Sequence, residues 1–99
     1  MIPSLPENSM IDQDFIQMIE KCKQDAQKDL PNIRILIDGF ITQKSTDKIT
    51  IEHTLDTLLD YALLEVGEEE FKRLHKYYES VNKNNADFYW RSYHDMLGL

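Results

Sequence analysis

Acidic side chains are concentrated between residues 49 and 70, a stretch that holds seven carboxylates and no lysine or arginine. Glu52, Asp56 and Asp60 recur every four residues there, so a helix would stack them on one face. Like charges at this spacing destabilise a helix by about 0.2–0.5 kcal/mol for each pair. The positive end of a helix dipole accounts for Glu52 and for the acids at 68–70, which fall near predicted helix starts. It does not account for Asp56 and Asp60.

A local cost without a local gain indicates a functional surface. Leu63 falls on the same helical face beside Asp60, and Glu65 follows near the predicted end of the helix. Such a surface would attract a basic protein by electrostatic steering, with Leu63 as its apolar anchor. The alternative interpretation is a solvated acidic face without a partner. The predicted partner-binding residues are Glu52, Asp56, Asp60, Leu63 and Glu65.

Other reactive side chains do not form a recognisable catalytic or metal-binding motif. The histidines lie on three different predicted helices without an HExxH motif or a Cys/His cluster, so we predict surface or edge histidines, no metal and no cofactor. Cys22 falls in an apolar stripe and is expected in the core. With three glycines, a phosphate-binding loop is not expected, and the sequence predicts that the protein is not an enzyme. The histidines are His53, His75 and His94.

Charge and composition bear on the partner and the compartment. The 99 residues carry 11 basic and 18 acidic side chains, and the net charge of −7 repels nucleic acids and anionic membranes. Seven of the ten aromatic residues follow position 70, but residues 84–99 contain only one cation, Arg91, so ring packing is favoured over base stacking. The sequence has no apolar stretch of transmembrane length and no signal-peptide pattern, and we expect a cytoplasmic protein.

Apolar side chains recur at helical spacing through most of the chain, which predicts an all-α fold. Residues 1–8, with two prolines, are expected to form an extended arm, and 9–99 a single helical domain. The Leu30–Pro31 pair predicts a break between the first two helices, because the residue before a proline avoids the helical region. Segment 30–41 also alternates like a strand, so that alternative stays open. The prediction is a small bundle of four to five helices at about 10–28, 32–43, 50–66, 68–81 and 86–97.

The core is predicted from the residues that are central in each apolar stripe. Burial of these side chains would supply most of the stability of so small a domain. The predicted core residues are Phe15, Ile19, Ile37, Leu55, Leu58, Leu59, Ala62, Leu74, Tyr78 and Trp90.

Together these features favour a non-catalytic acidic protein-interaction module, such as an inhibitor or immunity-type protein that binds a basic protein partner. The analogy with small acidic inhibitors rests on size and charge. The alternative is a structural or assembly subunit that forms a homodimer through the apolar surface of the helices predicted at 50–66 and 86–97. A weaker alternative is a metal- or ligand-binding helical bundle.

Overall fold

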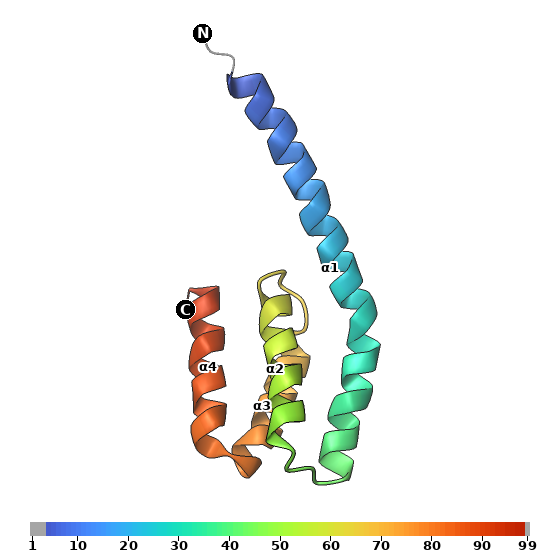
Figure 1. The fold of residues 1–99 in the computed structure, drawn as a ribbon, viewed down its shortest axis with the longest axis vertical. Coiled ribbons are helices and arrows are strands. Elements are labelled where there is room, and N and C mark those ends of the chain that lie inside the picture. The colour runs from blue at the N-terminus through green and yellow to red at the C-terminus, as the bar shows by residue number, and fades with distance from the viewer. Residues whose placement is uncertain (1–3, 99) are drawn as a thin grey trace.

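The fold is all-α, as predicted, and consists of four helices connected by short turns (Figure 1). The computed structural model describes the backbone of residues 4–98 and the side chains of residues 13–98, and no strand occurs in that range. Segment 30–41 is helical, which resolves the choice left open by the sequence. Each helix runs antiparallel to the preceding one (Figure 1). The helices are α1 (Ser4–Thr42), α2 (Lys48–Ala62), α3 (Glu68–Val81) and α4 (Lys83–Leu97).

Helix α1 is continuous through Pro31, so the predicted break at this residue is wrong. Pro31 cannot donate a backbone hydrogen bond, and an interior proline costs a helix about 3 kcal/mol. Continuing the helix places Ile33 and Ile37 in the core, where both are buried, and this burial offsets the cost. Figure 1 shows α1 bending where it leaves the bundle, as expected close to a proline. At the other end, α1 begins at Ser4 rather than following an extended arm over 1–8; residues 1–3 lie outside the described range.

The turns between α2, α3 and α4 are short and closely specified. Asp47 caps α2 by accepting a hydrogen bond from the Thr50 amide at 3.3 Å. Asn82 alone connects α3 to α4 and caps α4 by accepting from the Asn85 amide at 3.1 Å. Gly67 precedes α3 with φ of 83°, where a side chain would be strained. These turns fold α2–α4 into a compact three-helix unit against which α1 packs.

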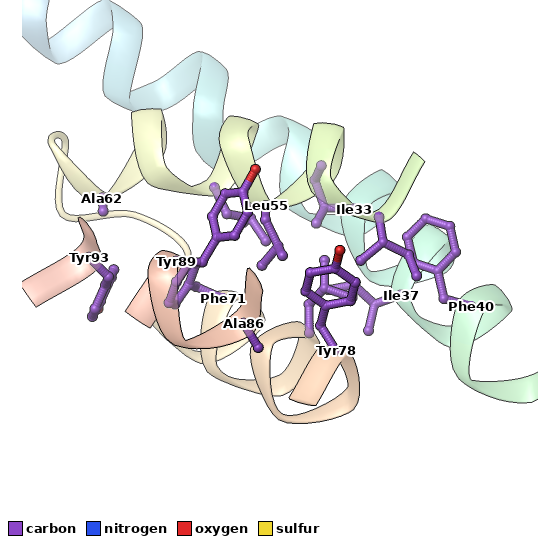
Figure 2. Close-up of a cluster of buried hydrophobic side chains, with 13 residues drawn as sticks. Ile33, Ile37, Phe40, Leu55, Ala62, Phe71, Tyr78, Ala86, Tyr89 and Tyr93 are labelled. Carbon is purple, nitrogen blue, oxygen red and sulfur yellow. The ribbon is translucent and has the colours of Figure 1, made fainter. Parts of the chain in front are cut away.

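The core lies between all four helices (Figure 2). Of the predicted core residues, six are buried and confirmed: Ile37, Leu55, Leu58, Ala62, Leu74 and Tyr78. Leu59 and Trp90 are partly buried and pack against the same cluster. Phe15 and Ile19 are exposed, so their placement in the core was wrong. The core also includes Ile33, Phe40, Ile51, Phe71, Ala86, Tyr89 and Tyr93.

Phe15 and Ile19 are exposed because α1 is much longer than the helices it packs against. It has 39 residues, whereas α2, α3 and α4 have 14 or 15, and at about 1.5 Å per residue the excess is more than 30 Å. Ala26 is the first buried side chain of α1 among the described residues. We call residues 4–25 the projecting half of α1 and residues 26–42 its bundle half. Figure 1 shows the projecting half extending away from the other helices.

Candidate functional site

The first two acids of the predicted binding strip are hydrogen-bonded to the core. The Glu52 carboxylate accepts hydrogen bonds from the Tyr78 hydroxyl and from the Asn85 side-chain amide, the latter at 2.7 Å. One turn further along α2, Asp56 accepts from the Tyr89 hydroxyl at 2.8 Å. Both acids therefore provide acceptors for tyrosines whose rings lie in the core.

The two tyrosines show the electrostatic effect of this arrangement. Burial, together with the hydrogen bond to Glu52, raises the pKa of Tyr78 to about 12. Burial also raises the pKa of Tyr89, and the hydrogen bond to Asp56 acts in the same direction. Neither hydroxyl is poised to exchange a proton near neutral pH, so the arrangement stabilises structure rather than supplying acid–base chemistry.

The remaining residues of the predicted strip are exposed near the end of α2. Asp60 lies in the last turn of the helix, and Leu63 follows it in the connection to α3 with 65% of its surface accessible. Glu65 is exposed in the same connection and has a positive φ of 59°. The strip thus runs along α2 instead of converging on one point, and only its last three members lack an assigned role in the core. Whether they form a docking surface or a solvated face stays a prediction.

A second surface, which the sequence interpretation missed, lies on the projecting half of α1. Its apolar stripe is exposed: Phe15 is 56% and Met18 57% accessible, and Ile19 is 38% accessible. Cys22 is exposed on the same stripe, so its predicted burial was wrong. The stripe continues without interruption into Ile33 and Ile37 of the bundle half. Large neighbouring apolar side chains left in water mark an interaction surface.

The apolar side chains of α2 and α4, by contrast, are mostly buried in the bundle. These helices correspond to the segments predicted at 50–66 and 86–97, which were the proposed surface of a homodimer. Only a few large apolar side chains of these two helices and their ends are exposed. They are Ile49 in the first turn of α2, Leu63 after the end of α2, and Phe88 and Leu97 on α4.

The histidines occupy three different environments. His53 is exposed and His94 is half-buried against Trp90, as predicted for surface or edge positions. His75 is buried, contrary to that prediction, because one ring nitrogen pairs with the Ala86 carbonyl oxygen at 3.0 Å and the ring stacks with Phe71. A shallow hollow beside His75 is lined by charges of both signs and by Trp90. His75 thus links α3 to α4.

Comparisons with protein-family models, with curated proteins and with solved structures produce no match to this chain. Within residues 4–98, no helix has the length and apolar character needed to cross a membrane. The described side chains contain no group of three or more histidine, cysteine or acidic residues arranged to hold a metal ion. Two exposed surfaces of the described residues are therefore the candidates for function: the acidic end of α2 and the projecting half of α1.

Proposed function

We propose that this chain is a non-catalytic protein-interaction module whose main binding element is the projecting half of α1. The observation that carries the proposal is the exposure of Phe15, Met18 and Ile19 on one face of a helix that extends beyond the bundle. In the described structure these side chains have no cover, although the same stripe is buried a few turns later. A protein surface is the natural cover for a helix face of this kind.

The stability of the helix supports the same proposal. Helices in proteins gain most of their stability from tertiary packing of an apolar face, and short isolated helices are marginal in water. The projecting half contains several residues of modest helix propensity, including Phe15, Ile16 and Ile19. A partner that covers the stripe would provide the packing that α2–α4 provide for the bundle half.

A second candidate surface is the exposed acidic end of α2, as the sequence suggested. Its specific support is Leu63, an exposed leucine beside the acids Asp60 and Glu65. An exposed apolar side chain with an acid on either side of it in the sequence suits a partner with a basic rim and an apolar pocket. The net charge of −7 would favour such a partner further. Glu52 and Asp56 would contribute to the field while remaining bonded to their tyrosines.

A photo-crosslinking experiment tests the main proposal. A photoreactive amino acid is placed at Met18 of the full chain, and a control is placed at Ile35, which is also exposed but faces away from the centre of the apolar stripe. After irradiation in native lysate, we expect protein adducts at position 18 that are absent at position 35. Equal labelling at the two positions, or no protein adduct at position 18, would contradict the proposal.

The acidic surface is tested separately by a paired reversal. Changing Asp60 and Glu65 to Lys should slow the association of a captured basic partner, and added salt should slow association of the unaltered chain in the same way. A partner that associates equally fast with both chains, at low and high salt, would show that the acidic end of α2 is only solvated.

A further inference from the structure

We infer that the apolar stripe on the projecting half of α1 is covered by a second copy of this chain, with the two α1 helices paired antiparallel. The inference rests on the proposed function and adds the identity of the partner. Three features of α1 support this pairing. They are the side of α1 on which the bundle lies, the order of charges along the helix, and the spacing of Asp14 and Lys21 around the exposed apolar residues.

The position of the bundle excludes a parallel pair. Ala26, Ile33 and Ile37 belong to the same stripe as Phe15 and Ile19, so α2 and α3 pack on the side of α1 that a second helix would have to cover. In a parallel pair joined through this side, the second copy's bundle half would run through the space that α2 and α3 occupy. An antiparallel pair places the two bundles at opposite ends and centres the contact on the projecting halves.

The charge order favours the same orientation. Among residues 13–20 the charged side chains are Asp14 and Glu20, both acidic, whereas residues 21–28 contain three lysines and one aspartate. An antiparallel pair brings the acidic segment of each copy beside the basic segment of the other. A parallel pair would align acid with acid and lysine with lysine, which is unfavourable.

One pair of residues sets the register. Asp14 and Lys21 are seven residues apart, so they lie on the same edge of the stripe, two helical turns from each other. Pairing Asp14 with the second copy's Lys21 puts the twofold axis close to Met18, at the centre of the exposed apolar residues. The symmetry then repeats the same contact on the other side of the axis. Phe15 of each copy packs near Met18 and Ile19 of the other.

The oligomeric state of the purified full chain is the primary test. We expect light scattering behind size exclusion to give twice the 11.7 kDa of one chain. Met18→Asp should give the single-chain mass, because it places a carboxylate at the centre of the interface, whereas the control Ile35→Asp should remain dimeric. A single-chain mass for the unaltered protein at micromolar concentration would overturn the inference, and so would a Met18→Asp dimer.

A charge-swap series tests the antiparallel register. Asp14→Lys and Lys21→Asp each create two like-charge contacts, and each should raise the dimer dissociation constant by about tenfold. The double variant restores opposite charges at both contacts and should return the dissociation constant to near its original value. A double variant that dimerises no better than the single variants would overturn the register.

Cys22 provides an independent measure of orientation. With the axis near Met18, the two copies of Cys22 are separated by roughly 13 Å along the pair, too far for a disulfide. Mild oxidation should therefore leave the dimer without a covalent link, while a parallel pair would place the two thiols together and crosslink readily. A Cys22–Cys22 disulfide in the dimer would overturn the antiparallel arrangement.

The crosslinking adducts and the mass of the purified chain together distinguish failure of the proposed function from failure of the proposed dimer. Adducts at position 18 that contain only other proteins, together with a monomeric purified chain, would retain the interaction module and overturn the second copy as its partner. An adduct of two copies of this chain supports both.

Discussion

The two halves of α1 carry the same apolar stripe but have opposite environments. Ile33 and Ile37 of the bundle half are buried, whereas Phe15 and Ile19 of the projecting half are exposed. Nothing in the local pattern separates them, since both pairs recur at helical spacing. The difference comes from the short α2, α3 and α4, which end before the projecting half begins. An amphipathic stripe thus indicates that a helix face needs cover, but not which segment or chain provides it.

The polar contacts follow the same division. The bundle half is tied to the other helices by the Tyr61 hydroxyl, which donates to Asp29 at 2.6 Å, and by two ion pairs between α1 and α3. No long-range hydrogen bond or ion pair is observed for the described side chains at 13–25. The projecting half therefore belongs to the part of the molecule that opens most easily when it is uncovered.

The largest expected effect on the free energy of unfolding comes from removing an aromatic ring from the bundle, compared with removing one from the projecting half. Phe71→Ala should lower the free energy of unfolding by about 3–5 kcal/mol, because Phe71 is fully buried and stacks on Tyr93 with ring centroids 4.4 Å apart. Phe15→Ala, made in a Met18→Asp background that prevents dimerisation, should change it by less than about 0.5 kcal/mol. Urea denaturation measures both. Comparable losses for the two rings would show that the projecting half is part of the folded core.

The sequence predicts much of the fold because the helical period dominates it. The all-α class and six core residues follow from stripes that the bundle does bury. The prediction is wrong where tertiary structure overrides a local rule: Pro31 stays within α1 because the residues after it pack in the core. It is also wrong at Phe15, Ile19 and Cys22, because burial there requires a partner helix that the described chain does not contain.

The candidate site could be predicted only in part, for a related reason. The sequence shows that the charge of Asp56 does not stabilise its own helix, either through the helix dipole or through a neighbouring charge. The gain comes from Tyr89, 33 residues further along, which becomes a neighbour only after folding. One available signal for the projecting half was length: the segments predicted at 10–28 and 32–43 together exceed any other helix of the chain.

The next effect compares two acids of α2. Asp56→Ala should cost about 1–3 kcal/mol, because the Tyr89 hydroxyl loses its acceptor, whereas Asp60→Ala should change the free energy of unfolding by less than about 0.5 kcal/mol. Asp56→Asn, which keeps an acceptor oxygen, should cost less than the alanine variant. Equal midpoints of urea denaturation for the two alanine variants would show that the bond to Tyr89 contributes nothing, and Asp56 would return to the set of partner-binding candidates.

High pH should destabilise the bundle, because its buried tyrosines titrate there. The projecting half contains no tyrosine and should not contribute to this effect. The pKa of Tyr78 is raised from 10.0 to about 12, so its contribution to stability is fully present below pH 10.0 and is lost as the pH rises toward 12. In that interval the unfolded chain has released a proton that the folded chain still holds. Tyr78→Phe should flatten the fall in stability between about pH 10 and about pH 12. An identical pH profile for the variant would contradict the assigned pKa shift.

The smallest effect concerns the ion pairs that hold the bundle half of α1 to α3. Arg73 pairs with Asp38 at 2.6 Å and Arg34 with Glu70 at 2.7 Å, and all but Glu70 are about half exposed or more. Exposed pairs contribute about 0.2–1 kcal/mol, so Asp38→Asn should have a small effect that vanishes in about 1 M salt. Glu70→Gln should cost somewhat more, because Glu70 is better shielded and also lies in the first turn of α3. If Asp38→Asn instead lowers the free energy of unfolding as much as Phe71→Ala, charge rather than apolar burial distinguishes the two halves of α1. The exposed apolar stripe would then no longer indicate that a second copy covers the projecting half.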